Sequence, residues 1–477
     1  MKSSRLLPLI VACALFIENM DSTVLSTSLP AIATDLATEP IALKLALTTY
    51  LLSLAVFIPV SGWMADRFGA QTTFMTAIAV FLLGSIGCAV SGSLGALVAA
   101  RFVQGMGGAM MVPVGRLVLL RSVPKHELVQ ALSWLTIPAL IGPMVGPPLG
   151  GFITTYFTWR WIFLINLPIG MLGMALALRF IPNVRDEAPA PLDWLGFALA
   201  GGGLGAAMFG FSTLGRHLVP TEVAAAALGI GIAGLVGYVI HARRHPHPLL
   251  DLNLFRLATY RAGVVGGSLF RVGIGASPFL LPLMLQIGFG LTPVQSGLLT
   301  FVSAVGAIFM KTLAATILRR AGFRRVLVWN ALAASAMLCA FGLFRPATPH
   351  LVIIATLLIS GCLRSLQFTS LNAISYAEID APRMGQASSL SGMLQQLSLS
   401  LGVAIAGYLL EIVGALTQQP PTVVTNFYWA FLGVGLVSMS SVWWMRRLPR
   451  NAGAEMAGRV RAARDAAGSG TNEQSAA

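Results

Sequence analysis

Long apolar segments recur along the whole chain, and each is long enough to cross a lipid bilayer as a helix. A membrane-spanning helix needs about 20 mostly apolar residues. We count fourteen such segments, joined by short polar connections, and they centre on residues 6–30, 45–64, 73–91, 96–118, 129–153, 161–181, 194–213, 222–241, 260–286, 295–317, 326–344, 350–374, 388–413 and 427–445. The sequence therefore predicts an all-α polytopic membrane protein with fourteen spans.

The composition excludes most classes of soluble protein. Of the 477 residues, 56% are hydrophobic and 10% are charged, whereas a soluble domain has about 45–50% apolar and about 25% charged residues. A water-soluble fold of this size cannot bury that much apolar surface. The net charge of +14 would indicate nucleic-acid binding in a soluble protein, but here we attribute it to membrane topology. We therefore expect a lipid bilayer around the chain and no nucleic-acid partner.

The basic residues are unevenly divided between the two sides of the predicted spans. If the N-terminus faces the cytoplasm, 22 of the 31 Lys and Arg residues fall in cytoplasmic segments. Four fall in outer segments (Lys44, Arg160, Arg216 and Arg345) and five inside spans (Arg101, Arg116, Arg271, Lys311 and Arg364). Lys and Arg collect in cytoplasmic loops. The pattern therefore predicts two cytoplasmic termini and a multi-pass protein of the inner (plasma) membrane.

A weak internal repeat divides the chain into two related halves. The second span ends in the turn Asp66–Gln71, and the tenth span ends in the turn Arg319–Arg325, with a glycine at the same place in both. If the seventh and eighth spans are an inserted pair, these two turns occupy equivalent positions, as in transporters built from two halves. The predicted domains are an N-terminal six-helix bundle (1–185), an inserted helix pair (186–250), a C-terminal six-helix bundle (251–447) and a disordered cytoplasmic tail (448–477).

Four sequence motifs occur in an order and spacing that is typical of one transporter family. They are Asp21–Val24 in the first span, Gly62–Gly69 after the second, Arg101–Ala109 in the fourth and Gly142–Gly151 in the fifth. Together they resemble the motifs of the fourteen-span drug:proton antiporters of the major facilitator superfamily, and so does the stretch 159–170. The resemblance runs from residue 6 to about residue 447. It implies a major facilitator fold, with two six-helix bundles plus two inserted helices.

The fifth-span motif places small residues on one helix face. Gly142, Gly146 and Gly150 recur every four residues, so a neighbouring helix can approach closely. Pro147 removes a helix hydrogen bond and allows a bend. One interpretation is tight packing alone. The other, which the resemblance implies for these residues together with Gly151, is a bendable interface that seals one side of the transporter.

The turn after the second span is a candidate gate. Asp66 and Arg67 lie between Gly62 and Gly69, and a carboxylate there can accept from a helix N-terminus or pair with a base. The sequence departs from the family pattern because Ala70 and Gln71 stand where basic residues are usual. The alternative is a solvated turn that only follows the charge bias of cytoplasmic loops.

Two acids lie deep in the first span. Glu18 and Asp21 are three residues apart, so they share a helix face, and a charge within a span is costly and usually functional. The resemblance makes Asp21 a proton-coupling candidate paired with Arg101, with Gln104 one turn away and Glu18 as a less typical addition. The alternative is a permanent buried ion pair that fixes helix packing.

The C-terminal half carries three bases inside spans. Arg271, Lys311 and Arg364 are expected to be buried, and the only acid within the spans of this half is Glu411, near an outer end. An isolated charge at the bilayer centre costs about 2.5–3.5 kcal/mol. One interpretation is that the bases bond carbonyls, lipid phosphate or amides such as Gln367 and Asn372. The other is that all five residues line a substrate cavity and favour anions or zwitterions.

We therefore expect a secondary active exporter of amphipathic small molecules that is coupled to protons and works by alternating access. No nucleotide-binding motif is present, and the four cysteines have no metal-ligand spacing, so we expect no cofactor and no metal. A dedicated exporter of an anionic or zwitterionic metabolite, an uptake symporter and a membrane sensor remain as alternatives. The six histidines lie in loops or at span ends, which argues against an intramembrane enzyme. No feature of the sequence indicates an adaptor protein.

Overall fold

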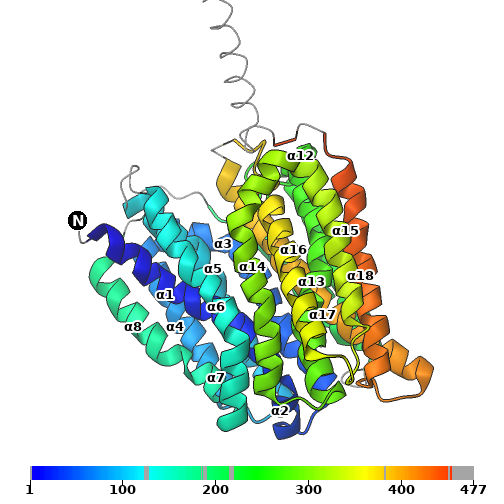
Figure 1. Cartoon of the computed structure of the whole chain (residues 1–477). Coiled ribbons are helices and arrows are strands. Elements are labelled where there is room, and N and C mark those ends of the chain that lie inside the picture. The colour runs from blue at the N-terminus through cyan, green and yellow to red at the C-terminus, as the bar shows by residue number, and fades with distance from the viewer. Residues whose placement is uncertain are drawn as a thin grey trace, which may run out of the picture.

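The protein is built from helices throughout the part of the chain that the computed structural model describes (Figure 1). This part comprises residues 3–122, 128–183, 185, 191–213, 220–380, 383–449 and 452–453, without the side chains of 3–6, 120–122 and 128–140. The predicted disordered tail lies almost wholly outside the described residues.

The helices follow the predicted order of two halves around an inserted pair. The N-terminal half contains α1 (Ser3–Val24), α2 (Leu29–Asp35), α3 (Lys44–Phe68), α4 (Ala70–Ala89), α5 (Leu94–Ser122), α6 (Leu128–Tyr156), α7 (Trp161–Leu164) and α8 (Asn166–Phe180). The inserted pair contains α9 (Trp194–Phe197), α10 (Gly203–Thr213) and α11 (Thr221–Arg244). The C-terminal half contains α12 (Ala258–Arg261), α13 (Gly267–Leu283), α14 (Pro293–Ala321), α15 (Phe323–Phe341), α16 (His350–Ser375), α17 (Met384–Thr417) and α18 (Val424–Arg446).

Thirteen helical segments among the described residues are long and apolar enough to cross a membrane. The remaining predicted span coincides with α6, a helix of 29 residues whose first side chains lie outside the described part. The count of fourteen and the cytoplasmic termini therefore stay predictions. The first span is shorter than predicted, because α1 gives way at Leu25 to a 3-10 turn and α2 then starts with Pro30 in its first turn. Proline has no N–H to continue the helix ladder.

Each half forms its own bundle, and the two bundles meet along two helix pairs. In the N-terminal half α1 packs on α6 and α5 on α4, and in the C-terminal half α13 packs on α17 and α14 on α16. Between the halves α6 contacts α14 and α3 contacts α17. The bundles come together at the end where α2 lies and diverge toward the end where α12 lies (Figure 1). We call these the α2 end and the α12 end.

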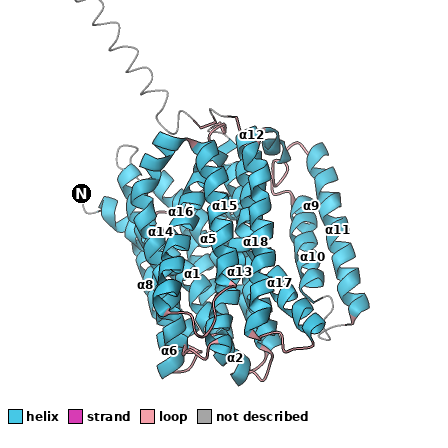
Figure 2. Cartoon of the chain, turned by 45° about the vertical axis from the view of Figure 1, so that its right-hand side comes forward, coloured by secondary structure: helices cyan, strands magenta, loops and turns pink. Residues whose placement is uncertain are grey.

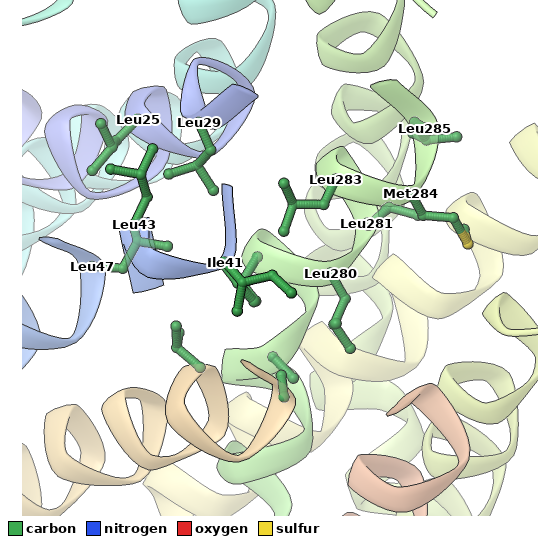
Figure 3. Packing of buried hydrophobic residues seen from close by; sticks show 14 of the residues in the cluster. Leu25, Leu29, Ile41, Leu43, Leu47, Leu280, Leu281, Leu283, Met284 and Leu285 are labelled. Atoms are coloured by element: carbon green, nitrogen blue, oxygen red, sulfur yellow. The ribbon is translucent and has the colours of Figure 1, made fainter. Parts of the chain in front are cut away.

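The hydrophobic core is shared between the bundles at the α2 end. One cluster combines Leu25, Leu29 and Leu43 of the N-terminal half with Leu280 and Met284 of the C-terminal half (Figure 3). Two further clusters each belong to one half. Burial of apolar side chains stabilises a contact by about 25 cal/mol per Å², so the shared cluster closes the molecule at the α2 end.

The inserted pair lies at one edge of the molecule (Figure 2). α10 and α11 pack closely, because a Cβ at Gly231 would come within 2.2 Å of Ala207 N and one at Gly210 within 2.4 Å of Leu228 N. A separate apolar cluster attaches the pair to α3 and α17, with Leu204 and Tyr238 among its members. The pair is thus a third packing unit beside the two bundles.

The two turns of the internal repeat are built alike. Gly69 ends α3 with φ 95° and ψ 146°, and Gly322 ends α14 with φ 81° and ψ 154°. Each glycine donates its N–H to the carbonyl four residues earlier, in Ala65 and Leu318 respectively. A positive φ is readily available only to glycine, so both positions require it. The similarity of the turns agrees with two related halves.

Candidate functional site

A network of buried polar side chains lies inside the N-terminal bundle. Asp21 of α1 and Arg101 of α5 form an ion pair, and both side chains are fully buried. Gln104, one turn further along α5, also belongs to the network, as do Ser85 of α4 and Asn166 of α8. The network thus joins four helices that are distant in sequence.

Asp21 is held by donors on both of its oxygens. Arg101 Nη1 donates to Oδ2. Gln104 Nε2 and Asn166 Nδ2 donate to Oδ1 at 2.8 Å and 2.9 Å. Hydrogen bonds to a carboxylate are roughly twice as strong as those between neutral groups, so the three donors fix the position of the Asp21 side chain.

Arg101 is enclosed as completely as its partner. Its Nη1 also donates to Gln104 Oε1 at 2.7 Å, and its Nε donates to the carbonyl of Ala46 in α3 at 3.4 Å. The guanidinium lies 4.0 Å from the ring centroid of Tyr50. An arginine over an aromatic face gains about 0.5–2 kcal/mol when it is desolvated. Arg101 is therefore fixed from three sides.

Glu18 differs from Asp21 in the hydrogen-bond partners of its carboxylate. It is 6% exposed, and among the described residues no hydrogen bond or ion pair reaches its carboxylate. Its Cγ lies 3.5 Å from the position of a Cβ on Gly108, and the hydroxyl of Tyr50 lies 3.2 Å from that same position. The Tyr50 hydroxyl is itself buried without a partner. A buried carboxylate without donors is costly in its ionised form, so the protonated carboxyl suits this site.

Two of the three predicted bases of the C-terminal half are buried without an acid beside them. Arg271 of α13 is fully buried, donates from Nη2 to Asn372 Oδ1 at 3.2 Å and lies 5.3 Å from the Phe368 ring centroid. Arg364 of α16 is half-buried and makes only a long contact, from Nη2 to Ser303 Oγ at 3.5 Å. No ion pair to either guanidinium is found in the described part of the chain.

Two of the sequence-based placements in this half need correction. Lys311 is exposed on α14 instead of buried, because an apolar segment indicates a span but not which helix face a side chain occupies. Gln367 is fully buried inside the bundle, where it bonds Asn330 at 2.8 Å and the Leu327 carbonyl at 3.2 Å, so it does not line a cavity between the bundles. Asn372, by contrast, is exposed and accepts from Arg271, in agreement with the interpretation that the bases bond nearby amides.

The fifth-span motif makes contacts on two sides of α6. A Cβ at Gly146 would come within 2.1 Å of Thr23 Oγ1, and one at Gly150 within 2.4 Å of the Val24 carbonyl, so this face packs on α1 as Gly142 does. A Cβ at Gly151 would come within 2.4 Å of the Pro293 carbonyl in α14. The motif therefore packs α6 inside its own bundle and also brings it against the other bundle.

The contact between α6 and α14 is reciprocal. A Cβ at Gly297 of α14 would lie 2.4 Å from the Pro147 carbonyl of α6. The backbone N–H of Val294 donates to Thr155 Oγ1 at 3.3 Å. Both glycines allow the two backbones to touch, and the contact lies at the α2 end.

A second contact between the bundles at the α2 end is ionic. Lys44 of α3 pairs with Glu411 of α17 at 3.2 Å, and Lys44 Nζ lies 4.5 Å from the ring centroid of Tyr408. Lys44, which the sequence predicts in an outer segment, is covered by the other bundle, since its side chain is 0% exposed. Glu411, whose side chain is 23% exposed, is likewise half of a pair that joins the two bundles.

The predicted gate residues lie at the α12 end, around the turn between α3 and α4. Gly62 and Arg67 are exposed, and Asp66 is half-buried. A Cβ at Gly69 would meet the Asn183 side chain at 2.1 Å. Gln71 donates to the carbonyls of Ala177 and Leu178 at 3.2 Å and 3.1 Å. An amide thus satisfies the last carbonyls of α8 at a position where the family pattern has a base.

Sequence reasoning missed several members of the buried network. Tyr50 and Ser85 are marked only as polar residues inside apolar segments. Asn166 lies in the stretch 159–170 that resembles the family, but no role is predicted for it. Their meeting depends on which faces of α3, α4 and α8 turn toward α1, and no single segment contains this information.

Comparisons with known proteins agree with this architecture. A family model described as "Major Facilitator Superfamily" matches residues 11–402 and 263–464. The chain is 36% identical over 445 residues to "Putative multidrug resistance protein MdtD" of Escherichia coli strain K12, covering 93% of this chain and 94% of that protein. The protein of the same name from Escherichia fergusonii is similar to the same extent, with 36% identity over 445 residues.

Solved structures show the same fold at low sequence identity. A D-xylose-proton symporter aligns with a TM-score of 0.67 at 16% identity, covering 94% of this chain and 98% of that one. The human organic anion transporter MFSD10 (TETRAN) aligns with a TM-score of 0.59 at 13% identity, covering 93% and 99%. The family match and the relatives at 36% identity are decisive. The chain belongs to the major facilitator superfamily.

Proposed function

We propose that the protein exports amphipathic small molecules across the inner membrane by alternating access, driven by protons. Membership of a transporter family and the likeness to MdtD support a multidrug-type transporter rather than an enzyme. Proton coupling and outward direction are our additions. The outward direction rests on the resemblance of Gly142–Gly151 to the antiporter motif. One observation carries the coupling: two acids lie one turn apart on α1, and only Asp21 is held by donors, whereas Glu18 is buried without any in the described part of the structure.

We assign the two acids different roles. Asp21 stays ionised with Arg101 and holds the bundle together. Glu18 binds a proton in one conformation and loses it in the other, when water or a cationic group of the substrate reaches it. One entering proton supplies about 2.3 kcal/mol per 100 mV of membrane potential. A site that is neutral when protonated and buried is suited to this exchange.

The contacts at the α2 end define the conformation in this proposal. The shared apolar cluster, the α6–α14 contact and the Lys44–Glu411 pair hold the bundles together there. We place the α12 end in the cytoplasm because the loops at that end, such as the turn with Arg319 and Arg320, carry most of the basic residues. The structure then corresponds to a state closed toward the outside. Transport requires these contacts to separate while the bundles close at the α12 end.

Purified protein in proteoliposomes tests the coupling. Glu18→Gln keeps the volume of the side chain and removes its proton exchange, so substrate accumulation driven by an imposed pH gradient should fall to background. Exchange of labelled for unlabelled substrate at equal pH should persist, since it needs no net proton movement. Asp21→Glu serves as the matched control, because it retains a carboxylate beside Arg101. Gradient-driven accumulation by Glu18→Gln at the wild-type rate would contradict the proposal.

The two guanidinium groups of the C-terminal half favour a second candidate, export of a dedicated anionic or zwitterionic metabolite. Arg271 and Arg364 contact amide and hydroxyl groups, and the described residues supply no acid to either. A guanidinium binds a carboxylate or phosphate through two parallel hydrogen bonds. Arg271→Gln and Arg364→Gln should then reduce transport of acidic substrates at least tenfold more than transport of lipophilic cations, with Lys311→Gln as the exposed control. Equal losses for both substrate classes would contradict this second candidate and favour multidrug export.

A further inference from the structure

Three metal-ligating side chains gather at the α12 end of the inserted pair. Asp193 precedes α9, His241 belongs to the last turn of α11 and His245 follows α11 directly. Each offers one ligand atom, and the three atoms lie within 4.8 Å of one another. None of these residues takes part in the transport mechanism proposed above. We infer that Asp193, His241 and His245 form a binding site for a divalent transition-metal ion, and that the ion fastens the start of α9 to the end of α11.

The carboxylate is already positioned for this role. The Asp193 side chain is 3% exposed. The backbone N–H of Gly196 donates to its Oδ1 at 2.8 Å, and that of Leu249 donates to its Oδ2 at 3.3 Å. Ligands that are oriented by further hydrogen bonds bind metal ions better than free ones. The site is therefore built on a fixed oxygen ligand in a nearly dry position.

The two imidazoles come from one helical turn. His241 and His245 are four residues apart, so they lie on the same side of α11, and their ring centroids are 5.0 Å apart. His241 Nε2 lies 2.8 Å from Asp193 Oδ1. In the metal-free protein a proton is shared across this contact. A metal ion takes the place of that proton, which is released to the solvent.

The donor set indicates which ions fit. Two imidazole nitrogens and one carboxylate oxygen resemble the three-ligand sets of open zinc sites, in which water completes the coordination. Calcium and magnesium prefer sites made of oxygen alone. Ligand atoms about 2.0–2.2 Å from a shared ion require smaller separations than 4.8 Å. The His245 ring must therefore move inward and give up the 3.2 Å hydrogen bond that His247 N donates to its Nδ1.

The rival explanation is purely structural. Asp193 caps α9, and its contact with His241 would then be an ordinary hydrogen bond between two helix ends. The two explanations differ in the role of His245: it is a ligand in the metal site, whereas it makes no contribution to the helix cap. His247 provides a matched control, since it lies in the same histidine-rich stretch, is exposed and stands outside the cluster.

The test uses the full-length protein in detergent, purified with a tag that contains no histidine and stripped with a chelator. Zn²⁺ is the probe, and its affinity is measured by competition with a chromophoric chelator. We expect one tightly bound Zn²⁺ per chain. His245→Ala and His241→Gln should weaken binding at least tenfold, whereas His247→Ala should change it less than threefold. The Tm should rise with Zn²⁺ in the wild type and not in His245→Ala.

Asp193→Asn keeps the proposal testable if the histidine variants fold poorly, because the asparagine oxygen still accepts from Gly196 and preserves the cap. It should bind Zn²⁺ at least tenfold more weakly, with only a small fall of the Tm in the metal-free state, because the amide nitrogen no longer accepts from Leu249 N–H. Equal Zn²⁺ binding by wild type, His245→Ala and Asp193→Asn would overturn the site, as would an absence of tight binding by the wild type.

Discussion

Glu18 and Asp21 lie one helical turn apart on α1, yet only the Asp21 carboxylate receives hydrogen bonds from other described residues. Asp21 receives donors from Arg101, Gln104 and Asn166. Glu18 is also buried, at 6% exposed against 0% for Asp21, and no donor to it is found in the described part of the chain. A fully satisfied carboxylate is suited to a permanent charge, and an unsatisfied one to a proton that comes and goes. Proximity in sequence therefore does not imply a common role.

The first prediction is that Asp21→Asn damages stability more than it damages coupling. The substitution leaves Arg101 fully buried without its counter-charge, and breaking a buried pair in this way costs about 3–5 kcal/mol. We expect a clearly lower Tm in detergent and reduced yield. Glu18→Gln should leave the Tm unchanged or raise it, because no donor is lost. A Tm for Asp21→Asn equal to that of the wild type would show that the network is not structural.

This contrast also shows which features of the fold and the site can be predicted from the sequence. The apolar segments locate the spans, and the resemblance to the drug:proton antiporters predicts that Asp21 pairs with Arg101, with Gln104 nearby. The sequence favours Asp21 over Glu18 for proton coupling, but it does not show that every donor reaches Asp21 alone, because one of them is Asn166, on a helix 145 residues away in sequence. The sequence does not predict that Lys44 is buried, since a charge at a span end gives no indication that another bundle covers it. The burial of Gln367 cannot be predicted from its own segment, because residues of α15 and α18 enclose it.

A second prediction concerns the backbone contact between α6 and α14. Gly151→Ala places a Cβ 2.4 Å from the Pro293 carbonyl, so the two helices must move apart at the α2 end. Overpacking of this kind costs about 1–3 kcal/mol. We expect the population to shift toward a state that is open at the α2 end. Gly205→Ala is the control, because a Cβ there meets nothing within 4 Å.

The opening can be followed with one reporter cysteine. Cys13, Cys88, Cys339 and Cys362 are first replaced by serine, and Ser400→Cys is then introduced. Ser400 is fully buried and donates to the Thr48 carbonyl of α3 at 3.1 Å, so it marks the contact between α3 and α17. A membrane-impermeant maleimide should label it faster in Gly151→Ala than in Gly205→Ala. Identical labelling rates would mean that the α6–α14 contact does not hold the α2 end closed.

A third prediction is a pH dependence at the α2 end. Arg160 donates to Asp35 Oδ2 at 2.7 Å and Trp159 Nε1 donates to it at 3.1 Å, and these hydrogen bonds hold the pKa of the Asp35 carboxyl below its ordinary value. A lowered pKa stabilises the fold above the unfolded-state pKa of about 3.9, and the stabilisation is lost as pH falls through the native value.

The effect should be small, because the Asp35 side chain is 44% exposed and exposed pairs contribute about 0–1 kcal/mol. We expect Asp35→Asn to lower the Tm slightly at pH 7 and to match the wild type at a pH below the native pKa. The measurement is thermal unfolding in detergent across that range. A Tm difference between Asp35→Asn and the wild type that grows as the pH falls would contradict a lowered pKa of the Asp35 carboxyl.

The last prediction concerns the Lys44–Glu411 pair, which joins α3 to α17. Lys44 is 0% exposed and Glu411 is 23% exposed, so the two partners are not equivalent. Glu411→Gln removes the carboxylate from a fully buried ammonium, whereas Lys44→Met leaves a carboxylate that water can reach. Glu411→Gln should therefore destabilise the closed α2 end more, and the Ser400→Cys reporter should be labelled faster in it than in Lys44→Met.

The double variant Lys44→Met with Glu411→Gln separates the ion pair from other effects of each substitution. If the pair itself closes the α2 end, the effects of the two substitutions on the free energy of closure should not be additive. The first substitution already abolishes the attraction between the two side chains, so the second cannot abolish it again. Labelling of the double variant should then be slower than in Glu411→Gln alone. Effects that add in the logarithm of the labelling rate would show that Lys44 and Glu411 act independently. The closed state would then depend on the apolar cluster and on the contact between Gly151 and Pro293.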